Sequence, residues 1–317
     1  MVTTQPTQVG PNRRGGAPTS PAMRTARRRR RGRLRGRWAP YLYIAPFLVS
    51  FVLFFALPSV LSLLLSFARD NGYTPARWVG LANYRALLSS PEFRQAALNT
   101  LFYWLVPMVP LMAGAFGLAM AVRSRLARWA SVCKPLIFIP QVIAPVSAAL
   151  VWRVMLSNQG VLNALFGLRT GWLEDPAAVK WSVAMLLVWR GIGWYFVVFL
   201  AGLTNVPETL LEAASIDGAN AFQRLRHVIM PLMRPTILFA IVIDTIASIQ
   251  LFTEPNLLLG GTTSTAGAPP EAAPLMNQIV NGITGGQFGL AAAAAWLMFL
   301  VIAVFSLIQF RLLREER

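Results

Sequence analysis

Six long apolar runs constrain this chain more than any other feature of its sequence. Each spans roughly 20 residues or more, the length of helix that the hydrocarbon core of a bilayer requires. The runs cover residues 41–67, 97–121, 135–156, 181–203, 236–259 and 289–310. Backbone groups in lipid must be hydrogen-bonded within one helix or a closed barrel, and the runs lack the alternation of barrel strands. With 56% hydrophobic and 13% charged residues and a mean hydropathy of +0.54, we expect an all-α membrane protein with six transmembrane helices.

The basic residues predict how these helices are oriented. If the N-terminus is cytoplasmic, 21 of the 29 Lys and Arg residues fall in cytoplasmic segments. The positive-inside rule therefore favours an N-in, C-in topology. This topology places residues 204–235, a polar segment between the fourth and fifth runs, in the cytoplasm.

The polar segment carries the local signals of two short helices. Asn205 and Pro207 suit the start of the first helix, as a cap and a first-turn proline. Gly218 can end it, since glycine enters the left-handed region without steric cost. We expect Asp217 to cap the second helix and the prolines from Pro231 onward to end it. Helices this short are unstable alone in water, so a partner surface is expected to hold them.

Residues Glu212–Pro231, which read EAASIDGANAFQRLRHVIMP, resemble the EAA loop of the permease subunits of binding-protein-dependent ABC importers. That loop is written E-A-A, three residues, G, nine residues, I, one residue and L-P. Val228 and Met230 stand where the family prefers Ile and Leu, and both keep an apolar side chain of similar size. The residues that the resemblance assigns to an ATPase-coupling loop are Glu212, Ala213, Ala214, Asp217, Gly218, Val228, Met230 and Pro231.

The flanks of this loop are similar to the carbohydrate-type branch of the family, the maltose- and glycerol-phosphate-like permeases. The similar stretches are Phe199–Ala219 and Ile229–Phe239, with further echoes at Asn99, Thr100, Trp152 and Gly160–Gly167. The resemblance covers most of residues 41–313, which form the expected permease domain, but neither residues 1–40 nor the loop at 260–288. In the family a further glycine and a proline usually follow the two glycines of that loop, and here they do not follow Gly260 and Gly261.

The resemblance implies a division of labour among several chains. The partners that it implies are a second, homologous permease chain, two ATPase subunits under the EAA loops and an extracytoplasmic solute-binding protein. The complex is expected in the cytoplasmic membrane, and its solute is expected to be a sugar or sugar-like compound moved into the cytoplasm. ATP with Mg²⁺ is assigned to the ATPase subunits, no cofactor is expected in this chain, and no nucleic-acid partner is expected.

The chain lacks the motif with which such importers bind ATP. A phosphate-binding G-x-x-x-x-G-K-[ST] loop needs a lysine directly after a glycine. The two lysines, Lys134 and Lys180, follow Cys133 and Val179. The G-x-S-x-G and H-E-x-x-H motifs are absent as well. We therefore expect a permease subunit without catalytic residues, whose ATP is hydrolysed by another polypeptide.

Residues 1–40 form a basic tail, which includes RTARRRRRGRLRGRW from Arg24 to Trp38. Few apolar residues and a single sign of charge predict disorder. We expect the tail to act as a topology signal and to contact anionic lipid headgroups. Nucleic-acid binding is the alternative, and the tail lacks the aromatic interleaving that would support it.

Two residue types occur once each. Cys133 is the single cysteine, so an intrachain disulfide is excluded, and a packing role is expected. His227 is the single histidine, which excludes a multi-histidine metal site.

Polar side chains in the fourth and fifth runs are candidates for the solute pathway. In the fifth run four of them share one helical face: Asp244, Ser248, Gln250 and Glu254. Charged groups are costly in lipid, so this face should meet protein or a cavity. We expect Arg190, in the fourth run, to pair with one of these acids, while nearby aromatic rings stack on a sugar. The predicted pathway residues are Arg190, Trp194, Tyr195, Asp244, Ser248, Gln250 and Glu254. The alternative is a salt bridge that only holds the bundle together.

Prolines and loops add two further expectations. Internal prolines, among them Pro107, Pro110 and Pro145, are expected to kink the runs. Residues 68–96 and 157–180 are expected to be outside loops, and Thr262–Pro274, which is low in complexity, is expected to be mobile.

Two other classes of function fit the same runs. A secondary transporter or channel would use Asp244 and Glu254 for ion coupling and would work without an ATPase. A membrane scaffold that transports nothing would use residues 204–235 to recruit a cytosolic protein. Uptake that survives ATP depletion would favour the first class, and the absence of any solute-dependent signal would favour the second.

Overall fold

The computed structural model describes residues 41, 43–124, 130–260 and 267–314. The basic tail at residues 1–40, with its expected disorder, lies outside these ranges, as do residues 262–266 of the low-complexity loop. The described residues up to Val60 belong to one compact unit, and those from Leu61 onward form a second.

The first predicted run is helical over Tyr43–Ser66. It contains a π-helical stretch, η1 (Val52–Ala56), followed by α2 (Leu57–Ser66). Phe47, Phe51 and Phe55 recur at intervals of four residues, and their successive rings stack at centroid distances of 6.3 and 5.1 Å. A long apolar helix at residues 41–67 is therefore confirmed.

The described residues from Leu61 onward are helical apart from loops and one small antiparallel hairpin, in which Ala68 pairs with Trp78 and Arg69 with Arg77. The elements that follow α2 are β1 (Ala68–Arg69), β2 (Arg77–Trp78), α3 (Ala82–Ser89), α4 (Pro91–Ser124), α5 (Ala130–Val142), α6 (Pro145–Met155), α7 (Val161–Phe166), α8 (Val179–Thr204), α9 (Glu208–Ile216), α10 (Ala221–Arg224), η3 (Leu225–Ile229), α11 (Met230–Ile249), α12 (Thr253–Gly260), α13 (Leu275–Thr284) and α14 (Phe288–Arg314).

Five helices of the described chain are long and apolar enough to cross a membrane, and one bent pair makes a sixth if it counts as a single span. The five are Tyr43–Ser66, Pro91–Arg123, Val179–Thr204, Ala221–Ile249 and Phe288–Arg311. The bent pair, α5 and α6, occupies the third predicted run and turns through 94°. The kink expected at Pro145 is confirmed, and it divides the run into two helices, because Pro145 disfavours a helical conformation at Ala144, whose φ and ψ are −56° and 139°.

The fifth predicted run, 236–259, is displaced at both ends. One helix extends over Ala221–Ile249, and a separate helix, α12, begins at Thr253. The expectation that Pro231 ends the preceding segment is also wrong. The π-helical turn η3 lies directly before it and already interrupts the regular i→i−4 hydrogen bonds, so a residue without an N–H is tolerated there.

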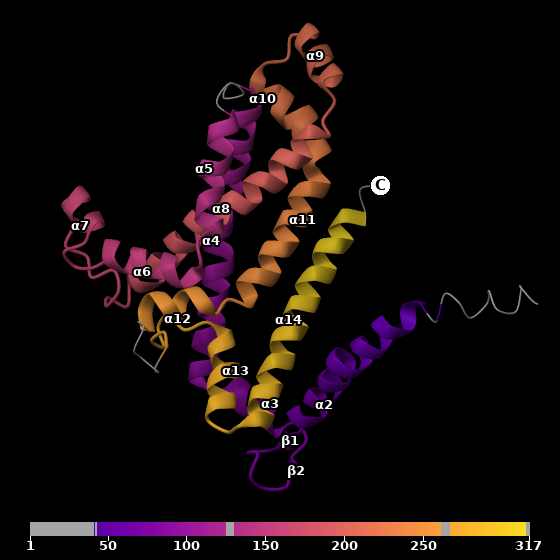
Figure 1. The fold of residues 1–317 in the computed structure, drawn as a ribbon, viewed down its shortest axis with the longest axis vertical. Coiled ribbons are helices and arrows are strands. Elements are labelled where there is room, and N and C mark those ends of the chain that lie inside the picture. The colour runs from indigo at the N-terminus through magenta and orange to yellow at the C-terminus, as the bar shows by residue number, and fades with distance from the viewer. Residues whose placement is uncertain (1–40, 42, 125–129, 261–266, 315–317) are drawn as a thin grey trace, which may run out of the picture. The chain divides into compact units, whose positions relative to one another are not determined.

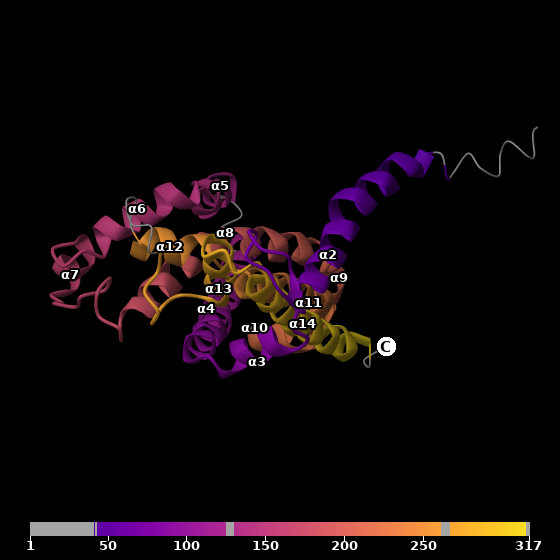
Figure 2. The same ribbon diagram turned by 90° about the horizontal axis from the view of Figure 1, so that it is seen from below.

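Helix α8 packs against α4, α5, α11 and α12 (Figure 1). Its side chains Phe196, Phe199 and Leu203 are completely or almost completely buried. Gly193 allows a close approach to α5, because a Cβ at this position would lie only 2.6 Å from the Ile137 carbonyl oxygen. Both views place α6 and α7 on the side of this bundle away from α14 (Figures 1 and 2).

The segment predicted as an outside loop at residues 68–96 contains β1, β2 and α3. The Asn83 side chain donates to the carbonyl oxygens of Ser66 and Ala68, at 2.9 Å each. Asn83 is buried, so these two bonds satisfy its donors and fix the hairpin to the end of α2.

The described part of the low-complexity loop is fixed to α4. Asn99 Nδ2 donates to the carbonyl oxygens of Pro270 and Ala273 at 3.0 Å, and the Leu275 N–H donates to Thr100 Oγ1 at 2.7 Å. These bonds join the loop to α4, and the expected mobility of the loop stays a prediction. Asn99 and Thr100, which the sequence analysis noted only for their similarity to the family, thus bind this loop.

Candidate functional site

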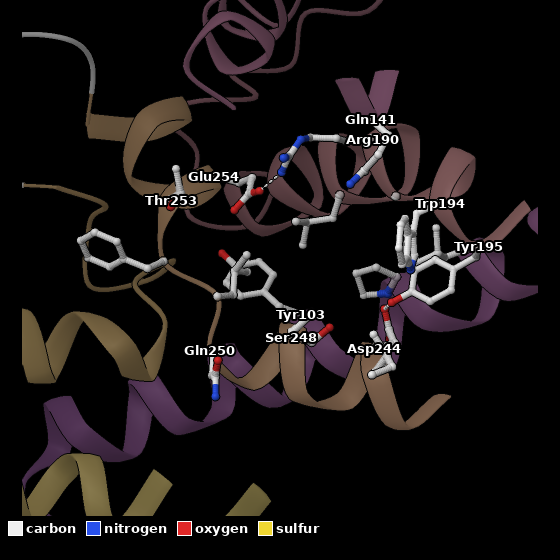
Figure 3. A pocket seen from close by; sticks show the side chains of 18 residues that line it. Tyr103, Gln141, Arg190, Trp194, Tyr195, Asp244, Ser248, Gln250, Thr253 and Glu254 are labelled. Carbon is white, nitrogen blue, oxygen red and sulfur yellow. Dashed lines mark hydrogen bonds and ion pairs between the residues drawn. The ribbon is translucent and has the colours of Figure 1, made fainter. Parts of the chain in front are cut away.

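A cavity of about 440 Å³ lies between α4, α8, α11 and α12, and α5 adds one polar side chain (Figure 3). All seven predicted pathway residues line it: Arg190, Trp194, Tyr195, Asp244, Ser248, Gln250 and Glu254. Side chains selected because they are costly in lipid thus converge on one space within the bundle.

An ion pair joins α8 to α12 at this cavity. Arg190 Nη1 donates to Glu254 Oε1, as the dashed line in Figure 3 marks, and the two side chains are 20% and 12% exposed. The expected pairing of Arg190 with an acid is confirmed. The expected helical face is wrong for Glu254, because α11 ends at Ile249 and the turn that follows places Glu254 on α12. Gln250, at the C-cap of α11, lines the cavity as well.

A second polar contact lies apart from the ion pair (Figure 3). The Tyr195 hydroxyl on α8 donates to Asp244 Oδ1 on α11 at 3.0 Å. Asp244 is 5% exposed, and its Oδ2 is buried without a hydrogen-bond partner in the described part of the chain. Such an oxygen is uncommon, because buried polar atoms are nearly always hydrogen-bonded.

Several lining residues escaped the sequence analysis, among them Tyr103 and Pro107 of α4, Gln141 of α5 and Thr253 of α12. Gln141 carried a usable signal, since it is a polar side chain inside an apolar run. Tyr103 carried none: it is fully buried, and its hydroxyl donates to the Ala272 carbonyl oxygen at 2.8 Å.

The second candidate site is the α9–α10 loop, residues 205–224, together with η3 and the first residues of α11. Gly218 has φ +79°, which confirms its expected left-handed conformation after α9. The expected caps are wrong. Asn205 is the C-cap of α8 and Asp217 is the C-cap of α9, while Asn220 caps α10 through a reciprocal pair of bonds with Gln223, at 2.9 and 2.8 Å. Asn220 has Gln223 three residues later, as a capping box requires, but Asn205 has Glu208 at the same spacing, so this signal alone does not tell the two apart.

The α9–α10 loop presents a mixed surface. The Arg224 guanidinium donates to Ser215 Oγ at 2.7 Å and so links the two helices. Two large apolar side chains nearby are exposed, Ile216 at 86% and Phe222 at 66%. Of the predicted coupling residues, Ala214 and Val228 are half-buried, and six are exposed: Glu212, Ala213, Asp217, Gly218, Met230 and Pro231.

Arg123, at the end of α4, fixes the start of the α9–α10 loop. Its Nη1 donates to the Leu203 carbonyl oxygen and its Nη2 to the Val206 carbonyl oxygen, the latter at 3.0 Å. Leu203 lies in the last turn of α8 and Val206 just beyond it, where carbonyl groups lack helical partners and a cation is favourable. The sequence analysis counted Arg123 only as a topology signal.

Cys133 and His227 occupy different surroundings. Cys133 is half-buried beside the cluster formed by α4, α8 and α11, as its expected packing role requires. His227 is exposed on η3, with Nδ1 3.1 Å from the Gln223 carbonyl oxygen. Among the described residues, no group of three or more His, Cys, Asp or Glu side chains is placed to hold a metal ion.

Comparison with protein families gives a match over residues 113–315, well over half of the chain. The matching family is described as "Binding-protein-dependent transport system inner membrane component". This chain belongs to that family. The matched range contains the α9–α10 loop and all cavity residues except those of α4 before residue 113. Together with the long apolar helices, the match identifies the chain as a multi-pass membrane protein.

Relatives of the permease align over most of their length. A "Probable ABC transporter permease protein YesP" of Bacillus subtilis is 32% identical over 299 residues, covering 92% of this chain and 94% of the relative. An "Arabinooligosaccharides transport system permease protein AraP" of the same organism is 31% identical over 283 residues, 86% of this chain and 88% of the relative. A "Lactose transport system permease protein LacF" of Rhizobium radiobacter is 29% identical over 286 residues, which cover 87% of this chain and 94% of the relative.

Solved structures share the fold of the permease. A chain of a bacterial ABC transporter involved in the import of the acidic polysaccharide alginate superposes with a TM-score of 0.75 and 24% identity, covering 90% of this chain and 99% of the other. A second structure, of an alginate ABC transporter with a pentasaccharide-bound periplasmic protein, gives a TM-score of 0.74 and 23% identity. At these identities the likeness establishes the fold alone.

Proposed function

We propose that the permease moves a saccharide into the cytoplasm as a transmembrane subunit of an ABC importer. The observation that carries this proposal is the cavity, where charged, amide, hydroxyl and aromatic side chains converge within the bundle. Carboxylates and amides bind sugar hydroxyls, and aromatic faces pack against the apolar face of a sugar ring. The relatives named for arabinooligosaccharides and lactose support the same class of solute.

The α9–α10 loop is the proposed contact with the ATPase. It carries the EAA-like motif, and the exposed Ile216 and Phe222 offer apolar anchors of the kind that dominate interfaces. The capping box and the Arg224–Ser215 bond would keep α9 and α10 rigid. Closure of two ATPase subunits, which bind ATP with Mg²⁺, would then move the loop as a lever and switch the cavity between outward and inward access.

The remaining partners follow from the proposed topology. With N-in, C-in orientation and the bent α5–α6 pair counted as the third span, the hairpin β1–β2 and α13 face outward. An extracytoplasmic solute-binding protein would dock on that side. A second, homologous permease chain, which the family resemblance implies, would complete the translocation pathway in the cytoplasmic membrane.

Purification from native membranes in mild detergent, followed by mass spectrometry of the associated proteins, tests the assembly. We expect an ATPase, a second permease and a solute-binding protein, and the last can then be screened for its saccharide. Recovery of the chain alone or as a homo-oligomer, from a preparation that keeps other membrane complexes intact, would contradict the proposal.

A secondary transporter is the second candidate, and one observation favours it. Asp244 is a membrane-buried acid whose Oδ2 has no partner in the described chain, as an ion- or proton-coupling site would require. Uptake that persists when ATP is depleted but collapses with the ion gradient would select this candidate over the importer.

A further inference from the structure

Three charged side chains line the cavity, and their charges do not balance. Arg190 is positive, whereas Asp244 and Glu254 are negative. The other polar lining residues are neutral: Tyr103, Gln141, Trp194, Tyr195, Ser248, Gln250 and Thr253. The lining therefore carries a net negative charge.

Arg190 is the single cation that the described residues give this lining, and its charge is already paired. Arg190 Nη1 is bonded to Glu254, and the Glu254 side chain is 12% exposed. Arg190 Nε is buried without a hydrogen-bond partner among the described residues, but a neutral hydroxyl oxygen can accept from it as well as a carboxylate can. An anionic solute that displaced Glu254 would leave that carboxylate unpaired in a poorly solvated site, which is strongly unfavourable, so Arg190 offers little net attraction for an acid.

Asp244 also has a buried atom without a hydrogen-bond partner among the described residues. Tyr195 donates to Oδ1, whereas Oδ2 is shielded from solvent and lacks a donor among the described residues. A carboxylate accepts hydrogen bonds and donates none. The partner that Oδ2 lacks is therefore a hydroxyl, an amine or an ammonium group, and never another carboxylate in its ionised form.

We infer that the cavity acts as a charge filter, accepting a neutral or amino-bearing saccharide unit and disfavouring uronic acids and other anionic units. A hydroxyl or ammonium group of the solute donates to Asp244 Oδ2. The Trp194 side chain, which lines the cavity and is 44% exposed in total, supplies an apolar face for the ring (Figure 3). This inference rests on the proposed saccharide transport and adds the charge of the solute.

The shared fold does not decide this property. One solved structure with the same fold belongs to a transporter of an acidic polysaccharide. Charge preference is set by the side chains of the cavity, so acidic and neutral saccharides of one length make a direct comparison possible.

The test measures saccharide binding to the complex purified from native membranes, after the solute-binding protein has been washed off. The probes are maltotriose, the fully deacetylated glucosamine trimer and trigalacturonate, which are neutral, cationic and anionic. A hydrogen bond to a charged group contributes enough to change affinity about tenfold or more. The unaltered complex should therefore bind the first two probes at least about tenfold more tightly than trigalacturonate.

Two substitutions sharpen the test without changing side-chain size. Asp244→Asn should weaken binding of the glucosamine trimer about tenfold and strengthen that of trigalacturonate. Glu254→Gln should give trigalacturonate about a tenfold gain, because the Arg190 charge becomes available. This gain of trigalacturonate binding tests the charge filter even if the Asp244→Asn variant fails to assemble. Glu174→Gln, which removes an exposed carboxylate outside the cavity, is the control and should leave all three affinities unchanged.

Each outcome has one meaning. Equal affinity of the unaltered complex for maltotriose and trigalacturonate would overturn the charge filter and leave saccharide transport standing. A trigalacturonate affinity that stays unchanged in both variants would overturn it too. Failure of all three probes to bind would overturn the proposed saccharide function, and the filter with it.

Discussion

The cavity and the α9–α10 loop use the same kinds of side chain in opposite surroundings. In the cavity, Arg190, Asp244 and Glu254 are largely buried, and each is either paired or left short of a partner. In the loop, charged residues such as Glu212 and Asp217 are exposed to solvent. Leaving a charged side chain without a partner therefore costs far more free energy in the cavity than in the exposed loop.

The two regions therefore give different kinds of information about function. In the cavity, the buried atoms without a hydrogen-bond partner among the described residues indicate the chemistry of a solute that fits there. In the exposed loop, the Asn220–Gln223 box and the Arg224–Ser215 bond fix the local shape. Substitutions should therefore have large effects on the fold in the cavity and small, local effects in the loop.

The largest effect is expected from Arg190→Met, which leaves Glu254 unpaired. Breaking a buried ion pair costs about 3–5 kcal/mol, so thermal unfolding of the detergent-solubilised protein should shift strongly downward. Adding Glu254→Leu should recover much of the loss. Arg226→Met removes an exposed arginine from η3 and should change stability by under about 0.5 kcal/mol. Equal shifts of the unfolding temperature in Arg190→Met and Arg226→Met would contradict the proposed difference between the cavity and the loop.

Gly193→Ala tests the packing that builds the cavity wall. The added Cβ would meet the Ile137 carbonyl oxygen at 2.6 Å, so α5 must move away from α8 at a cost of about 1–3 kcal/mol. Gly117→Ala is the matched control on α4, since a Cβ there meets nothing within 4 Å, and it should be neutral or slightly stabilising. Unfolding temperatures of the two variants that do not differ would show that α5 and α8 are not packed this closely.

Arg123→Gln tests the junction between the bundle and the loop. Loss of a charged donor to two carbonyl oxygens costs about 1.5–3 kcal/mol. The effect should be local, seen as faster amide hydrogen exchange over residues 203–210 with little change in α4. Arg85→Gln, an exposed arginine on α3, should leave exchange in that segment unaltered. Global loss of protection would instead assign Arg123 to the core of the fold.

The smallest effect is expected from Asn220→Ala, which removes the cap of α10. Capping residues contribute about 1 kcal/mol, and the loss should appear as faster exchange at residues 221–224 only. Because Asn220 and Gln223 act as a pair, the variant that also carries Gln223→Ala should be little worse than the single one. Additive losses would show that the two side chains act separately.

Long apolar runs predicted most of the helical segments, since the bilayer's length requirement is simple and strong. Pro145 predicted a kink in the third run, although not its angle of 94°. The failure lies at the turn after Ile249, which separates Glu254 from the helix of Asp244. This turn does not change the average apolar character of the run, so composition does not reveal it.

All seven residues predicted for the solute pathway line the cavity, although part of the helical geometry used to group them was wrong. Their role in transport stays a prediction. Costly polar groups in lipid must gather on protein, whichever helix carries them. Tyr103 and Arg123 went unnoticed because their roles depend on carbonyl oxygens distant in sequence, those of Ala272 and of Leu203 and Val206. No local pattern encodes such a contact.

ATP hydrolysis by the purified complex in liposomes, with the saccharide-loaded binding protein present, tests the central claim most directly. Glu212→Lys, in the loop, should abolish stimulation by every saccharide in a normally assembled complex. Asp244→Asn, in the cavity, should keep stimulation and change which saccharide gives it. Full stimulation in Glu212→Lys would contradict the account, because the α9–α10 loop would then not couple the cavity to the ATPase.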